Sequence, residues 1–175
     1  LEYRGDGYVS AWAARGYASL ASQGMTIDED ANEIYVWMKS TAANLVLIYD
    51  LQTGKYKKGF IPKTRSGLLG NVSSSSIVIR SIAGKKYAFV RLRHNYLSKI
   101  EIPTSFVDGA ELVADIDYNF AFTHTFCFDG VNWWFTNAEG KEFNIIGEYN
   151  INILTRRNDN FEITGFVDVG IDTVG

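Results

Sequence analysis

The residues best suited to binding a ligand are three polar side chains at the start of otherwise apolar strands. Gln23 lies five residues before Asp28, and His124 lies five residues before Asp129, each aspartate opening a predicted turn. A third such position falls at Ser75, inside a run of serines. Amide, hydroxyl and imidazole groups donate and accept hydrogen bonds, as sugar hydroxyls require. The pattern predicts a ligand site built from Gln23, Ser75 and His124, although such side chains at strand starts suit the satisfaction of backbone groups equally well.

Tryptophan side chains provide a second set of candidate ligand residues. An indole face stacks on a sugar ring through apolar contact, and the chain has 4 tryptophans. Trp133 and Trp134 are neighbours, so on a strand they point to opposite faces and one can be buried while the other is exposed. Trp37 lies in another apolar strand. The alternative for all three is packing between sheets.

Few residues have the types or spacing that metal or nucleophilic chemistry needs. His94 and His124 are the only histidines, and their spacing gives no metal site. Cys127 is the only cysteine, and its alternation with two phenylalanines favours a buried structural thiol over a nucleophile. The acidic run 28–30 is compatible with calcium, but it lacks the glycine and distal glutamate of an EF-hand, so a plain turn fits better.

Catalysis is the less favoured role. No Gly-x-Ser-x-Gly segment is present, and a glycosidase pair cannot be recognised among 20 acidic residues. We therefore expect no catalytic residues, no metal and no cofactor.

The elements that must position these side chains are strands. Apolar and polar residues alternate with a period of two, and turns rich in Asp, Asn and Gly separate the apolar runs. Three stretches, roughly residues 22–62, 73–103 and 123–169, repeat the order of apolar strand, polar turn and second strand. A spacing near fifty residues is typical of a β-propeller blade. We expect a single all-β antiparallel domain over residues 1–175 that is β-propeller-like with about three repeats; a β-sandwich or another meander is the alternative.

The N-terminal segment carries two further expectations. Residues 8–14 contain Tyr, Val and Trp, which favours a strand, while the alanines of residues 11–21 leave a short helix as the alternative. The chain begins with Leu rather than Met, which indicates a piece of a longer protein.

Composition and charge narrow the range of partners. The 175 residues are 46% hydrophobic and 21% charged, which is ordinary for a globular domain. The net charge of -3 argues against a nucleic-acid binder and against a basic membrane-surface domain. No apolar run is long enough to span a membrane.

Part of the chain resembles a known group of proteins. The segments Gln23–Asp30, Asn32–Val36 and Ile48–Lys55 resemble a propeller blade of bacteriophage tail-fibre and receptor-binding proteins. The likeness is partial for residues 123–135 and faint for residues 73–92. It therefore covers about half of the chain, and its motifs mark architecture more than activity.

The resemblance implies a function. It indicates a receptor-binding domain of a phage tail, extracellular on the virion, that recognises a bacterial surface polysaccharide or wall polymer. Three repeats fall short of a closed ring, so we expect a homo-oligomer or association with other tail proteins. A glycan-degrading tailspike module, sialidase-like or lyase-like, and a purely structural tail-assembly domain are the alternatives.

Overall fold

The computed structural model describes residues 12–74, 76–120, 125–136 and 153–168, and the regular elements that these residues form are almost exclusively β-strands. Along the chain the strands are β1 (Ala21–Asp28), β2 (Glu33–Lys39), β3 (Asn44–Asp50), β4 (Tyr56–Lys63), β5 (Ile77–Ile82), β6 (Lys85–Arg93), β7 (Tyr96–Ile102), β8 (Ala110–Val113), β9 (Ile116–Asn119), β10 (Phe126–Phe128), β11 (Trp133–Thr136), β12 (Ile153–Arg157) and β13 (Ile163–Asp168).

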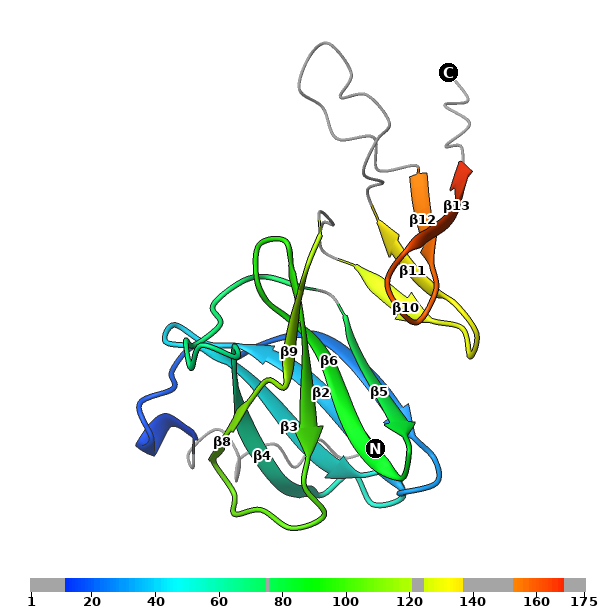
Figure 1. Cartoon of the computed structure of the whole chain (residues 1–175). Helices are drawn as coiled ribbons and strands as arrows, with labels where there is room; N and C mark the ends of the chain where they lie inside the picture. Colours follow the sequence, from blue (N-terminus) through cyan, green and yellow to red (C-terminus); the bar gives the residue numbers. More distant parts are fainter. Residues whose placement is uncertain (1–11, 75, 121–124, 137–152, 169–175) are drawn as a thin grey trace, which may run out of the picture.

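The strands form three sheets that begin one after another along the chain, and β8, which lies between β7 and β9 in sequence, joins the first of them (Figure 1). The first sheet has the order β1-β2-β3-β4-β8, the second β5-β6-β7-β9 and the third β10-β11-β12-β13. Neighbouring strands are antiparallel except for β4 and β8, which run parallel. The predicted ranges 22–62, 73–103 and 123–169 correspond to β1–β4, β5–β7 and β10–β13, with β8 and β9 between the last two.

Local turn chemistry explains where the first hairpin of each sheet reverses. Asp28 Oδ1 accepts the Ala31 amide at 3.1 Å, in the turn between β1 and β2. In the turn between β10 and β11, Asp129 Oδ1 accepts the Asn132 amide at 2.7 Å. The β5–β6 turn has only two loop residues, Ala83 and Gly84, both with positive φ (51° and 77°), the backbone that short hairpins favour. Asp28 and Asp129 thus hold corresponding turns in the first and third sheets.

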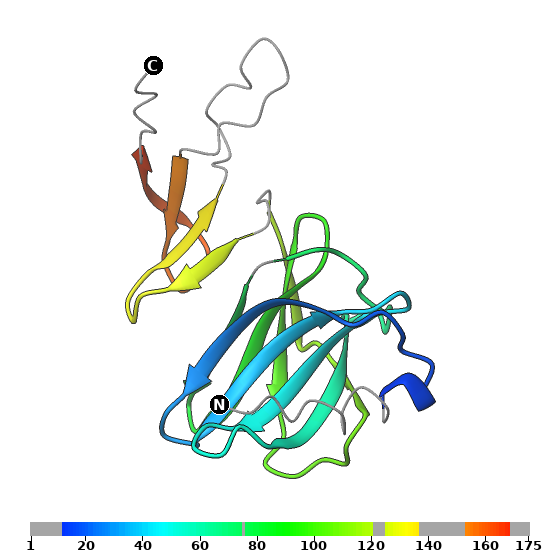
Figure 2. The same cartoon turned by 180° about the vertical axis from the view of Figure 1, so that it is seen from behind.

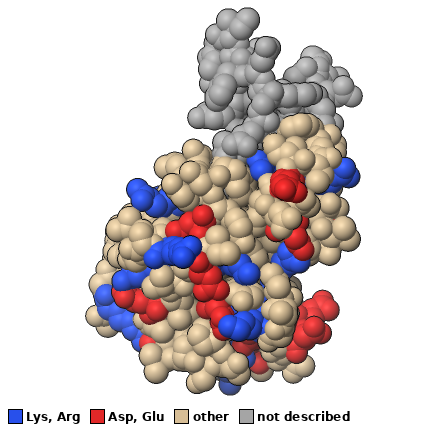
Figure 3. Space-filling model, viewed as in Figure 1, with Lys and Arg blue, Asp and Glu red and all other residues tan. Residues whose placement is uncertain are grey.

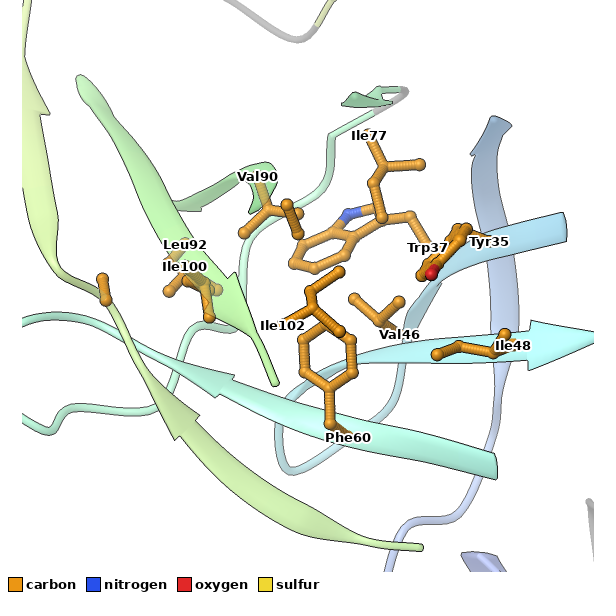
Figure 4. Close-up of a cluster of buried hydrophobic side chains, with 12 residues drawn as sticks. Tyr35, Trp37, Val46, Ile48, Phe60, Ile77, Val90, Leu92, Ile100 and Ile102 are labelled. Carbon is orange, nitrogen blue, oxygen red and sulfur yellow. The ribbon is translucent and has the colours of Figure 1, made fainter. Parts of the chain in front are cut away.

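The main core lies between the first and second sheets (Figure 4). Alternate residues of each strand point into it, as the period of two requires. From the first sheet Trp37 and Phe60 are fully buried, and Val90 and Ile100 meet them from the second.

A second core joins the second sheet to the third. Phe89 of β6 packs against Trp133, with ring centroids 4.7 Å apart, and Phe161 completes the aromatic cluster. Ala88 and Val90 of the same strand face the first sheet, so β6 is buried on both faces. The second sheet is therefore the middle layer of three, and Figure 2 shows the third sheet standing beyond the first two.

The first strands of the sheets are neighbours, with β5 in contact with both β1 and β10. Over the described residues, however, no sheet closes on itself and no ring is formed. The chain is all-β with antiparallel sheets, as expected, whereas the β-propeller expectation is not confirmed.

A strand was expected over residues 8–14, of which residues 8–11 lie outside the described residues. Residues 12–14 form a helical turn and not a strand. Trp12 is fully buried against the outer face of the first sheet, where it meets Leu45 and Leu47. Its indole N–H donates to the Tyr56 hydroxyl at 3.0 Å. Burial of Trp12 holds this segment to the sheet without any strand pairing. The strand-forming residue types therefore do not decide the structure of residues 12–14.

Candidate functional site: a polar pocket between two sheets

The predicted ligand residues are placed very differently from one another. Ser75 and His124 lie outside the described residues. Gln23 is half-buried on β1, and its amide contacts the carbonyl of its own neighbour Ser22 at 3.4 Å. The strands that carry these positions do converge, since the Phe126 amide donates to Ser76 Oγ at 2.9 Å and so ties the start of β10 to β5.

Burial separates the predicted tryptophans. Trp37 is 0% exposed and Trp133 is 1% exposed, so neither offers a ring face to a ligand. Both point into cores between sheets, which was the alternative for them. Trp134 points the other way and is half-buried, and its indole N–H donates to Asp129 Oδ2 at 2.7 Å.

Cys127 corrects another expectation, because it is exposed and not a buried thiol. On β10 the two flanking phenylalanines turn toward the third-sheet core, so the period of two directs the cysteine outward.

A groove of about 380 Å³ runs between β1, β5 and β10. Most of its lining residues have apolar side chains, and on β1 these include Met25 and Ile27, which are 66% and 46% exposed. Gln23 is not among its lining residues. Over the described residues, the groove therefore lies where the strands converge, but it includes neither Gln23 nor any charged side chain.

A pocket of about 320 Å³, lined by charged side chains, opens between the first and second sheets at the end where β2 and β6 begin. Its walls come from both sheets and from the loop that follows β7. The charged and aromatic side chains of this lining are Glu33, Tyr35, Lys58, Lys85, Lys86, Glu101 and Phe106.

Glu33 is the centre of a hydrogen-bonded cluster in this pocket. Glu33 and Tyr35 are two positions apart on β2, so both side chains face the second sheet. The Tyr35 hydroxyl donates to Glu33 Oε2 and Lys57 Nζ donates to Oε1, each at 2.6 Å. Burial alone would raise the pKa of Glu33, but the hydrogen bonds from Lys57 and Tyr35 lower it below its ordinary value. Glu33 is therefore an ionised acceptor at neutral pH.

Lys86 connects the two sheets across the pocket. It is the second residue of β6, and its ammonium lies 2.8 Å from Asp28 Oδ2 and 3.4 Å from Glu33 Oε2. It also donates to the Tyr35 hydroxyl at 3.3 Å. Burial would lower the pKa of Lys86, but the two carboxylates raise it above its ordinary value. Burial and the bond to Glu33 raise the pKa of Tyr35, so the phenol stays protonated and remains a donor.

The rest of the lining adds an aromatic ring, an ion pair and exposed hydroxyl groups. Lys58 Nζ lies 3.9 Å from the centroid of the Phe106 ring. Lys85 pairs with Glu101 at 2.7 Å. Ser81 and Thr104 are exposed at the rim. The pocket thus offers an aromatic face beside donors and acceptors, all held by strands.

This chemistry suits binding better than catalysis. A general acid must hold a proton at working pH, and the lowered pKa of Glu33 opposes this. Both of its oxygens are already bonded, which opposes a nucleophilic role. Asp28 is engaged in its turn and with Lys86, as the plain-turn interpretation requires. Within the described part of the chain no group of three or more potential metal ligands occurs, and no helix there has the length and apolarity needed to cross a bilayer.

Charges of both signs are interspersed on the face seen in Figure 3, and neither forms a continuous patch there. Local ion pairs account for much of this balance, such as Lys63 with Glu111 at 2.5 Å across β4 and β8.

Sequence reasoning missed the pocket because its residues come from different sheets. The Glu-x-Tyr spacing on β2 and the lysine pair after the β5–β6 turn were visible signals. Only the face-to-face packing of the two sheets shows that Lys86 meets Asp28 and Glu33.

Known proteins provide no further guide to the site: no family model matches the sequence, and no curated protein matches it.

Proposed function

We propose that this chain is a binding module that recognises a saccharide in the pocket between the first and second sheets. The observation that carries the proposal is the fixed cluster of Glu33, Tyr35 and Lys86 beside the ring of Phe106. Concave sites with a few convergent polar groups are the usual places for small ligands. A sugar presents hydroxyl groups at its edge and apolar C–H groups on its face, which matches an ionised carboxylate, ammonium groups and an aromatic ring.

The biological setting is proposed from the resemblance to phage tail proteins. In that setting the module belongs to a virion tail and the saccharide is part of a bacterial surface polysaccharide or wall polymer. A glycan-degrading role is the weaker alternative, because Glu33 is ionised and bonded on both oxygens.

The propeller-like arrangement is part of the same proposal. Three features support it: the antiparallel strand groups β1–β4, β5–β7 and β10–β13 follow one another in the chain, their sheets stack face to face, and their first strands β1, β5 and β10 adjoin. These strands would be the inner strands of successive blades. Self-association, or association with other tail proteins, stays a prediction, and a structural assembly role remains its counterpart if no ligand is found.

The proposal is tested by blocking the pocket at its rim. Ser81 is exposed at the end of β5, so Ser81→Trp fills the opening without removing a core contact. Ser22 is equally exposed but lies at the opposite end of β1 from Asp28, so Ser22→Trp is the matched control. We expect Ser81→Trp to abolish the signal on a bacterial glycan array and Ser22→Trp to retain it.

The opposite pattern would place the site at the end of β1 that carries Gln23, and so would refute the pocket. An assay for new reducing ends on the bound glycans separates binding from cleavage. Their release by the native chain would replace the binding proposal with the enzymatic alternative.

A further inference from the structure

The charges that line the pocket are unequal. Three lysines and two glutamates face it, namely Lys58, Lys85, Lys86, Glu33 and Glu101. The whole chain has a net charge of -3, so this local excess of positive charge runs against the overall balance.

Ion pairing accounts for all of these lining charges except one lysine. Lys86 is paired with Glu33 and with Asp28, and Lys85 is paired with Glu101. Among the described residues, Lys58 forms no ion pair, and its ammonium lies over the Phe106 ring.

The position of Lys58 limits how its charge can be satisfied. It lies on β4 directly opposite Ile48, a core residue, so its stem is half-buried and its ammonium is held at the pocket wall. A cation–π contact with Phe106 orients the ammonium but does not neutralise it. An anion entering the pocket gains a charge-assisted hydrogen bond from a donor that is already fixed in place.

We infer that the ligand of this pocket is an acidic saccharide, whose carboxylate or phosphate pairs with Lys58. Its hydroxyl groups would then meet Ser81, Thr104 and the Lys85–Glu101 pair at the rim. The inference rests on the proposed saccharide-binding function and narrows it to anionic sugars. A lysine ammonium acts as a point charge and accepts carboxylate or phosphate, so the experiment has to separate the two.

The experiment compares sugars that share a ring and differ in the group at C6, which is a carboxylate, a neutral ester or a phosphate. Galacturonic, glucuronic and mannuronic acids are each titrated beside their methyl esters and beside the corresponding hexose 6-phosphates, and amide shifts are followed by ¹H–¹⁵N NMR. For at least one sugar series we expect the acid or the phosphate to bind about tenfold more tightly than the neutral ester, as one additional charge-assisted hydrogen bond provides. The stronger of the two anions identifies the natural group.

Two lysine variants make the inference specific. Lys58→Met should remove the preference for the anion, so that the ratio of acid to ester affinity falls to about one. Lys55→Met makes the same charge change in the exposed β3–β4 turn, outside the pocket, and should preserve the preference.

The results that would overturn the acidic-saccharide inference differ from those that would overturn saccharide binding itself. Equal binding of acid and ester, or an undiminished preference in Lys58→Met, overturns the inference while saccharide binding stands. Absence of pocket shifts with every sugar in the panel overturns the inference together with the saccharide proposal.

Discussion

At the scale of a single residue, Glu33 both shapes the pocket and helps to hold the first two sheets together. Its carboxylate fixes Tyr35 and Lys57, and it helps to hold Lys86 of the second sheet. Its side chain is only 13% exposed, so these bonds are shielded from water to an extent that surface ion pairs are not. The same bonds shape the pocket and stabilise the contact between two sheets, so perturbing them should change stability in a pH-dependent way.

Replacing Tyr35 with Phe should show this coupling. The variant removes one donor to an ionised carboxylate and should lower the free energy of unfolding by about 1–2 kcal/mol at pH 7. Because the folded-state pKa of Glu33 is lowered, its contribution is present above the ordinary carboxyl pKa and is lost as pH falls through the folded value. The deficit of the variant should therefore shrink in urea unfolding at low pH.

Tyr17→Phe is the matched control, since the Tyr17 hydroxyl makes no hydrogen bond with any described residue. It should show little deficit at either pH. A deficit of Tyr35→Phe that is the same at pH 7 and pH 3 would show that the hydroxyl acts independently of the charge on Glu33.

At the scale of elements, the helical turn at residues 12–14 is held to the first sheet by one hydrogen-bonded network, which runs from the buried Trp12 to an ion pair at the surface. Tyr56 accepts from Trp12 and donates to Asp108 Oδ1 at 2.6 Å, while Arg15 pairs with Asp108 Oδ2 at 2.7 Å. Gly59 lies beneath the indole, where an added Cβ would stand 2.8 Å from Trp12 Cζ2. The indole therefore occupies a close-fitting position that few other side chains could fill.

Truncation of this anchor should be costly. Trp12→Ala removes a fully buried ring from the cluster that covers the outer face of the first sheet. We expect a loss of about 3–5 kcal/mol in unfolding free energy, measured by urea denaturation. Trp12→Phe keeps most of the apolar contact and should lose much less. A Trp12→Ala protein as stable as the native chain would show that the segment is not part of the folded core.

At the scale of elements, the sequence predicts the turns but not which face of a strand is buried. The turns at Asp28, Ala83–Gly84 and Asp129 were predictable because turn chemistry depends on adjacent residues. The face on which a side chain lies depends on packing partners distant in the sequence. For this reason Trp37 is buried between sheets and Cys127 is exposed. For the same reason residues 12–14 form a helical turn although their residue types favour a strand.

The candidate site was less predictable than the fold class, for the same reason. Ligand positions inferred from strand starts assume that these strands enclose a polar channel. Among the described residues, the groove that β1, β5 and β10 form has no charged side chain, and Gln23 does not line it. The polar pocket depends on the packing of Lys86 against Glu33 and Asp28, which no local pattern encodes.

At the scale of the whole molecule, stacking of sheets creates two different concave surfaces. Among the described residues, the groove between the first strands is lined mostly by apolar side chains, whereas the pocket between the first two sheets is lined by charged ones. The central claim is that the pocket, and not the groove, holds the saccharide. The two surfaces have different side chains, so contacts to a bound sugar distinguish them directly.

Intermolecular NOEs measured with the tightest-binding uronic acid or ester provide that test. The account predicts NOEs from sugar protons to the Phe106 ring and to the methyl group of Thr104. Phe106→Leu should weaken binding and remove the ring signals while keeping the fold. NOEs to the methyl groups of Met25 and Ile27, with none to Phe106, would place the sugar in the groove and contradict the account.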